Sequence, residues 1–233
     1  MPDLDSSPLP VTERMQQLID EWQARNDRRA AFLACYHVMT ANMLAAIEQG
    51  EFNDPEWVSS WLQHFAGYYF NALDEYEQGD PTTPSVWRQT FDAASQPSTL
   101  TLQNLMLGVN AHINYDLIFA LVDMLEPEWY LLSDDERQER YDDHCQVNAV
   151  IQRSIDAVQD TIIEPGDPLM EFADWLLGPT DEWAVSRLIS GWRESVWQHA
   201  KSLLEAADLE ERQRVKSEIE KEALERARLI LRI

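Results

Sequence analysis

The segment that most constrains the fold is residues 98–126, STLTLQNLMLGVNAHINYDLIFALVDMLE. It is too long for a strand, contains no proline, and is apolar on nearly every side of a helical projection, which predicts a helix that is buried all round. We therefore expect it at the centre of the protein. Its polar side chains are costly to bury unless each finds a hydrogen-bond or metal partner; they are Asn104, Asn110, His112, Asn114 and Asp116.

The rest of the chain has the composition of a helical protein. Only seven of the 233 residues are glycine, and hydrophobic residues make up 45%, so a sheet-and-turn architecture is disfavoured and there is ample material for a core. We predict an all-α, single-domain bundle of about seven to nine helices around the central helix. Residues 1–10 are expected to be disordered, residues 11–233 to form one helical domain, and residues 208–233 to form a charged C-terminal helix.

Two helix starts are marked by local sequence signals. Asp54 followed by Pro55 predicts a capped helix start, because aspartate accepts hydrogen bonds from free N–H groups and proline suits the first turn. Ser133 and Glu136 have the spacing of a capping box, which predicts a second start. Gly50 stands where a helix favours a residue in the left-handed conformation at its end.

The charge and composition exclude several classes of partner. Forty-two acidic residues against eighteen basic ones give a formal charge of -24, which repels nucleic acid and anionic membrane surfaces. We expect no segment that is long and apolar enough to span a bilayer, and no signal peptide at the start. Cys35 and Cys145 are too few for a disulfide framework. The prediction is a soluble, cytoplasmic protein.

The C-terminal helix has a narrow apolar seam between charged faces. This seam predicts either a helix packed on the rest of the chain or half of a dimer interface, so the protein is expected to be a monomer or a homodimer through this helix. The seam consists of Val215, Ile219, Ala223, Ala227 and Ile230.

His112 and Asp116 are four residues apart and should project from the same face of the central helix. Such a pair can supply two ligands to one zinc or iron ion. It can also be a histidine that a carboxylate orients for proton transfer. The alternative is a structural pair that satisfies itself within the core.

Further polar residues extend the candidate site. His144 and Asn148 repeat the four-residue spacing on another helix, and each of the five histidines falls on a different predicted helix, on or beside its apolar face. A bundle can bring such residues together on a metal. If a metal is bound, His112 and Asp116 are expected as ligands, with the set completed by His144, His64 or His37.

Further residues are candidates for cofactor or substrate contacts. If a metal is bound, Asn114 or Asn148 is expected to contact the side chains that bind the metal and not the metal itself. Asn110 and Asn114 point away from His112, where amides most often bond across a helix interface. Arg193, a cation in an aromatic and otherwise acidic helix, is expected either in a structural salt bridge or as an anchor for a substrate carboxylate.

The central motif resembles a known family. The run from Leu107 to Leu117, LGVNAHINYDL, resembles the G-x-N-A-H-I-N-x-D-L signature of a bacterial family of all-helical domains of unknown function (DUF5995-like). The likeness extends upstream to Tyr69 and Trp87, and downstream to Asn148, Arg193 and Trp197. The resemblance implies a single helical domain with a shared polar core, namely Asn110, His112, Asn114 and Asp116. It implies no particular reaction.

These observations favour a small metal-assisted enzyme, a hydrolase or an oxidoreductase, with its site at His112 and Asp116 and a small molecule as its substrate. Without a metal, His112 is expected to act as the acid/base group and Asp116 as its orienting partner. The competing hypothesis is a non-catalytic helical binding or interaction module in which the same residues are structural.

Overall fold

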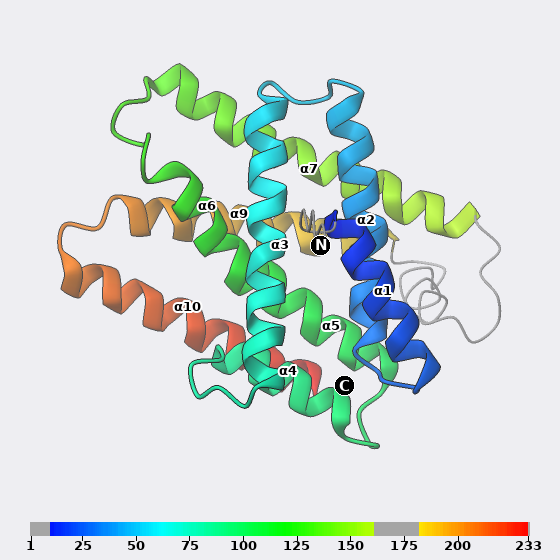
Figure 1. Cartoon of the computed structure of the whole chain (residues 1–233). Coiled ribbons are helices and arrows are strands. Elements are labelled where there is room, and N and C mark those ends of the chain that lie inside the picture. Colours follow the sequence, from blue (N-terminus) through cyan, green and yellow to red (C-terminus); the bar gives the residue numbers. More distant parts are fainter. Residues whose placement is uncertain (1–9, 161–181, 233) are drawn as a thin grey trace, which may run out of the picture.

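The structure is a computed structural model that describes residues 10–160 and 182–232 (Figure 1). Every regular element in these two ranges is helical, which confirms the all-α prediction. The predicted disorder of residues 1–10 lies outside the described residues, apart from Pro10. The elements are α1 (Val11–Ala24), α2 (Ala30–Glu48), α3 (Pro55–Glu77), α4 (Ser85–Ser95), α5 (Thr101–Ala111), η1 (His112–Asp116), α6 (Leu117–Leu125), α7 (Asp134–Asp160), α9 (Glu182–Leu204) and α10 (Leu209–Ile230).

A central rod, formed by α5, η1 and α6 in direct succession, confirms the predicted buried helix. The rod packs against α2, α4 and α10 through α5, and against α3 and α9 through α6 and η1. Figure 1 shows it running behind α3, which crosses it at a steep angle. Its fully buried apolar side chains include Leu107, Ala111, Leu117, Ala120 and Leu121. The core of the protein therefore lies along the segment that the sequence marks as apolar all round.

The rod differs from the expected continuous α-helix at its centre, where η1 is a five-residue π-helix. The N–H of Leu117 bonds to the carbonyl of His112, five residues earlier instead of four. A π turn of this kind accommodates one residue more than an α turn, and such turns occur often at functional sites. The two residues of the candidate pair, His112 and Asp116, are the first and last residues of this turn.

The predicted helix starts are confirmed. The side chain of Asp54 accepts a hydrogen bond from the Trp57 N–H at 2.9 Å. The capping box is present, because Glu136 accepts from the N–H of Ser133 at 2.8 Å and Ser133 Oγ accepts from the N–H of Glu136 at 3.3 Å. After α2, Gly50 has a φ of 73°, the left-handed conformation expected of it.

Gly108 lets α2 approach the central rod closely. A Cβ atom at this position would lie 2.3 Å from Cγ and 2.7 Å from Cβ of Phe32, a buried residue of α2. Real Cβ atoms do not come so close to other carbon atoms, so any larger residue would push Phe32 away. Gly108 therefore fixes the position of an aromatic ring one turn before His112.

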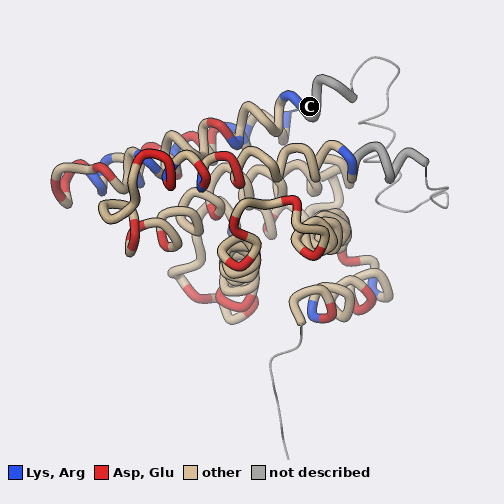
Figure 2. The backbone as a smooth tube through the Cα atoms, turned by 90° about the horizontal axis from the view of Figure 1, so that it is seen from above, with Lys and Arg blue, Asp and Glu red and all other residues tan. Residues whose placement is uncertain are grey.

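The apolar seam of α10 packs within the chain, as the first of the two alternatives predicted. All five seam residues are buried. Asn110 donates a hydrogen bond to the carbonyl of Ala223 at 2.9 Å, and Gln103 donates one to the carbonyl of Ile230 at 3.2 Å. The rest of α10 is charged, and Figure 2 shows Lys and Arg positions alternating with Asp and Glu along it. The face of α10 that stays open to other molecules is therefore the charged one.

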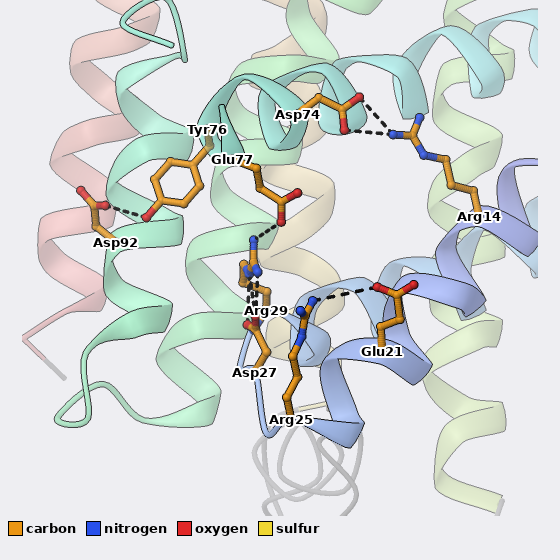
Figure 3. A network of polar contacts seen from close by, with 9 residues as sticks. All are labelled: Arg14, Glu21, Arg25, Asp27, Arg29, Asp74, Tyr76, Glu77 and Asp92. Carbon is orange, nitrogen blue, oxygen red and sulfur yellow. Dashed lines mark hydrogen bonds and ion pairs between the residues drawn. The ribbon is translucent and has the colours of Figure 1, made fainter. Parts of the chain in front are cut away.

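Ion pairs join the ends of the first helices at the surface (Figure 3). Arg29 binds Asp27 at 2.6 Å and Glu77 of α3 at 2.9 Å, and Arg14 of α1 binds Asp74 of α3 at 3.1 Å. Exposed pairs of this kind contribute about 0–1 kcal/mol each. The Arg29 side chain is mostly buried, so its two carboxylate partners compensate for the lost hydration.

From the sequence we expect no membrane-spanning segment, but within the described residues two helices are long and apolar enough to cross a membrane by length and composition, namely Ala30–Glu48 and Thr101–Leu125. In the structure 50% of the first apolar window and 72% of the second are buried by other helices. The core helix of a protein without membrane spans meets the same criterion.

Candidate functional site

The polar centre of the protein is a triad of hydrogen-bonded side chains around Asp116. Nδ1 of His112 lies 3.0 Å from Oδ2 of Asp116. The indole N–H of Trp87, from α4, donates to both carboxylate oxygens of Asp116, at 3.0 and 2.9 Å. His112 is 3% exposed, Asp116 1% and Trp87 0%. The spacing in the sequence predicts the contact between histidine and aspartate, but not the role of Trp87 as donor.

Aromatic rings surround the imidazole of His112. Its ring stacks on Phe65 of α3, with 3.7 Å between centroids and 11° between planes. Tyr36 of α2 packs edge-on at 4.3 Å. Three more rings lie at 5.8–6.2 Å, from Phe32, Tyr69 and Trp87. The pair is thus held in an apolar shell to which α2, α3 and α4 all contribute.

This shell sets the charge state of the pair. Burial lowers the pKa of His112 well below its usual value. Burial also raises the pKa of Asp116 well above its usual value, against the opposing effect of the Trp87 hydrogen bond. Each shift disfavours the charged form of its group. Burial therefore raises the cost of charging either group unless the other carries the opposite charge.

A cavity of about 140 Å³ lies beside the pair, with His112 in its wall. Its other walls come mainly from α2, α3, α7 and α9 and are almost entirely apolar; they include Met39, Met43, Leu62, Phe65, Val147, Ile151, Ile189 and Trp192. An apolar cavity of this size accommodates a single aromatic ring.

Four buried polar atoms belong to residues of the cavity wall and find no hydrogen-bond partner among the described residues. They are Tyr36 Oη, Trp61 Nε1, His112 Nε2 and Arg193 Nε. Buried polar atoms without partners are rare and costly, so each of these four atoms needs a physical explanation. All four residues carry N–H or O–H groups, and neutral His112 can also accept at Nε2.

The remaining histidines of the predicted metal set lie apart from the pair. His64 is exposed and its Nε2 lies 2.9 Å from Asp123. His144 is buried against Trp61 and Trp197, and its Nε2 lies 2.9 Å from the carbonyl oxygen of Arg193. His37 is half-buried on α2, where burial lowers its pKa. Within the described residues, no three His, Cys, Asp or Glu side chains come together as a metal site.

The asparagines expected to contact a cofactor have mainly structural partners. Asn110 bonds to the backbone of α10, and the amide of Asn114 donates to the Asn110 side chain at 3.1 Å. Asn148 is half-buried on α7, and its Oδ1 has no partner in the described part of the chain. The two central asparagines thus connect the rod to α10, on the side that the sequence predicts.

Most aromatic partners of the pair have no signal in the sequence that connects them to it. Phe65 and Tyr36 come from helices far away in the sequence, and no spacing rule relates them to His112. Trp87 is an exception, because it is one of the positions at which the sequence resembles the family. Trp61 and Tyr36, which belong to the cavity wall, resemble ordinary core residues in the sequence.

Fold and site together define an all-helical protein in which a buried histidine–aspartate pair borders an apolar cavity. The chain belongs to the family described as a family of unknown function (DUF5995), which matches residues 10–233. This membership confirms the resemblance found in the central motif. Searches of curated proteins and of solved structures found no match. The family carries no assigned activity, so the function has to be argued from the site.

Proposed function

We propose that this protein is a small acid–base enzyme in which His112 exchanges a proton with a largely apolar substrate held in the cavity. The observation that carries the proposal is the state of the two ring nitrogens of His112. Nδ1 is held by Asp116 at 3.0 Å, whereas Nε2 has no partner among the described residues and belongs to a side chain of the cavity wall. A general base needs this arrangement, with one nitrogen oriented by a carboxylate and the other free for the substrate.

The surroundings of Asp116 support this role. When Nε2 takes a proton from a substrate, the ring becomes an imidazolium, and the carboxylate at 3.0 Å stabilises the new charge. Trp87 donates to both oxygens of Asp116 and so keeps the carboxylate oriented toward Nδ1. The aromatic shell keeps water away, which strengthens these interactions. Asp116 is therefore proposed as the residue that positions His112 and stabilises its charged form.

The donor set does not fit the metal-assisted version of this enzyme. Both oxygens of Asp116 already accept from Trp87, and one also contacts His112. No third ligand side chain reaches the pair from the described residues. The proposal therefore assigns proton transfer to the side chains alone.

Hydrolysis of p-nitrophenyl acetate, a single-ring neutral ester, tests the proposal. In this reaction Nε2 of His112 takes a proton from a water molecule that enters the cavity with the ester, the water oxygen bonds to the carbonyl carbon, and p-nitrophenolate leaves, so that acetic acid is the second product. We expect saturable hydrolysis that falls by about 10²–10⁴-fold in His112→Gln and strongly in Asp116→Asn. His64→Gln is the matched control, because His64 also pairs with an aspartate at 2.9 Å but lies at the surface, away from the cavity. Circular dichroism and melting curves verify that each variant is folded. Equal rates in wild type and His112→Gln, or no hydrolysis by the wild type, would contradict the proposal.

A second function has one observation in its favour. Asn110 and Asn114 use the polar side of the rod to hold α10, so part of this polar core is structural. If His112 and Asp116 serve the same purpose, the protein is a non-catalytic helical module. In that case His112→Gln and Asp116→Asn lower the melting temperature, and neither variant changes any binding or turnover.

A further inference from the structure

Arg193 of α9 is a buried cation. It is 3% exposed and belongs to the wall of the cavity at His112. No Asp or Glu among the described residues contributes to its electrostatic surroundings, and burial lowers its pKa to about 10. A buried charge without a counter-ion is among the most costly groups a protein can carry. Such a group needs an explanation beyond the packing of the helix that bears it.

The nearby acidic groups are occupied elsewhere. Asp143 is 1% exposed and directly precedes His144, but its two oxygens accept from the backbone N–H groups of Asn53 and Asp54 at 2.7 and 3.0 Å. Glu194, the next residue after Arg193, accepts from the hydroxyl of Tyr141 at 2.7 Å and from Gln198 at 2.9 Å. Neither carboxylate neutralises the guanidinium.

His144 holds Arg193 in place through two polar contacts. Arg193 Nη2 donates to the carbonyl of His144 at 2.7 Å, and it lies 3.4 Å from the Nδ1 of the same residue. His144 Nε2 lies 2.9 Å from the carbonyl oxygen of Arg193, so in its neutral form it donates there and leaves Nδ1 as an acceptor. The guanidinium is therefore fixed by neutral groups, while its Nε has no partner within the described residues.

The guanidinium and the cavity together define a class of ligand. A guanidinium binds a carboxylate with two parallel hydrogen bonds, and this pairing is strong when water is excluded. The rest of the wall is apolar and aromatic, and a volume of about 140 Å³ suits one ring or a short chain. The chain as a whole carries a formal charge of -24, and Figure 2 shows Asp and Glu positions on most helices. An anion is thus attracted by Arg193 locally, against the net charge of the protein.

We propose that the cavity binds a small apolar monocarboxylate, with its carboxylate on Arg193 and its apolar body between α2, α3 and the ring of His112. This inference rests on the proposed function for its choice of cavity and specifies the class of substrate. His144 is a positioning residue for Arg193, and Trp61, whose Nε1 also lacks a partner among the described residues, can donate one more hydrogen bond to the bound molecule.

Calorimetric titration with phenylacetate and with 2-phenylethanol tests the inference, because the two compounds share a ring and differ in the carboxylate. We expect the wild type to bind phenylacetate at least about tenfold more tightly than 2-phenylethanol, from one charge-assisted contact. Arg193→Met should abolish this preference. Arg153→Met, at an exposed arginine that binds Glu51 at the surface, should keep it. Equal binding of the two compounds, binding of neither, or an unchanged preference in Arg193→Met would overturn the inference.

A spectroscopic readout covers the case in which Arg193→Met does not fold. In the wild type, phenylacetate should shift the ¹⁵N resonance of Arg193 Nε, and 2-phenylethanol should not; an unshifted resonance at saturation contradicts the inference. The two proposals also fail separately. His112→Gln should still bind phenylacetate although it no longer hydrolyses p-nitrophenyl acetate. If the protein hydrolyses p-nitrophenyl acetate but does not prefer phenylacetate to 2-phenylethanol, only the proposed class of ligand is wrong. If it prefers phenylacetate but does not hydrolyse the ester, only the proposed enzymatic function is wrong.

Discussion

Trp87 and Asp116 form the most completely buried polar contact around the candidate site, with one indole N–H shared between two carboxylate oxygens at 3.0 and 2.9 Å. The two residues lie 29 positions apart in the sequence, on α4 and at the end of the π turn. Through this contact, a short helix outside the central rod controls the carboxylate that orients His112.

The first prediction concerns this hydrogen bond. Trp87→Phe removes the donor, and we expect a larger loss of stability than in Trp22→Phe, by about 1–3 kcal/mol, because a buried carboxylate is left with one partner fewer. Trp22 is the matched control, since it is equally buried and its Nε1 has no partner among the described residues. The pKa of Asp116 should rise further in Trp87→Phe, because the bond favours the ionised form. Urea unfolding gives the difference, and equal losses in the two variants would show that the bond has no net effect.

The second prediction concerns the approach of α2 to the rod. Gly108→Ala brings a methyl group against the buried ring of Phe32, and we expect a loss of about 1–3 kcal/mol from overpacking, larger than the gain in helix propensity. Gly67→Ala is the control, because a Cβ added to Gly67 in α3 would have nothing within 4 Å, and this variant should gain up to about 1 kcal/mol. Thermal unfolding compares the two. A smaller loss from Gly108→Ala in a Phe32→Ala background, which lacks the Cγ and Cδ2 atoms that the new methyl group would meet, would identify the ring as the cause.

The third prediction concerns pH. The pKa of His144 is lowered well below 6.5, first by burial and then by the charge of Arg193. The unfolded chain therefore takes up a proton as the pH falls below about 6.5, whereas the folded protein does not until the lowered pKa is reached. Stability is then lost with falling pH in this window, by about 1 kcal/mol per pH unit from this residue. His144→Gln should reduce the slope of stability against pH between about pH 6 and 5 by that amount.

The measurement for this prediction is a series of urea unfolding curves at several pH values. Proton resonances of the His144 ring provide an independent check, because they should stay at their neutral positions at pH values where a free histidine is protonated. A His144 ring that titrates near its usual pKa in the folded protein contradicts the prediction, whatever the unfolding curves show.

The parts of the fold that depend on local sequence could be predicted. Asp54 with Pro55, and Ser133 with Glu136, act within one helical turn, so the residues that define these helix starts are neighbours in the sequence. The buried rod followed from its apolar surface alone. The packing of α10 was one of two alternatives, because an apolar seam looks the same whether the chain or a second copy covers it.

The π turn and the surroundings of the pair could not be predicted in this way. A π turn exchanges one hydrogen-bond register for another, and the choice depends on the helices that pack on both ends of the rod. The contacts of His112 with Phe65 and Tyr36 depend on how α2 and α3 cross the rod. The face of a helix on which a histidine lies follows from the local sequence. Whether histidines on different helices come together depends on how those helices pack. The pattern therefore located the individual histidines without revealing that His64 and His144 lie apart from the pair.

The extra residue of the π turn also sets the rotational phase between the two ends of the rod. Each residue of a regular helix turns the chain by about 100°, so removing one residue between 112 and 116 would rotate α6 by about that angle relative to α5. If the side of α5 that bears Asn110 kept its contact with α10, the apolar side of α6 would then lose its contacts with α3 and α9. The extra residue at the histidine–aspartate pair thus lets α5 present one face to α10 while α6 presents another to α3 and α9. The same π turn therefore determines both the geometry of the site and the packing of the bundle.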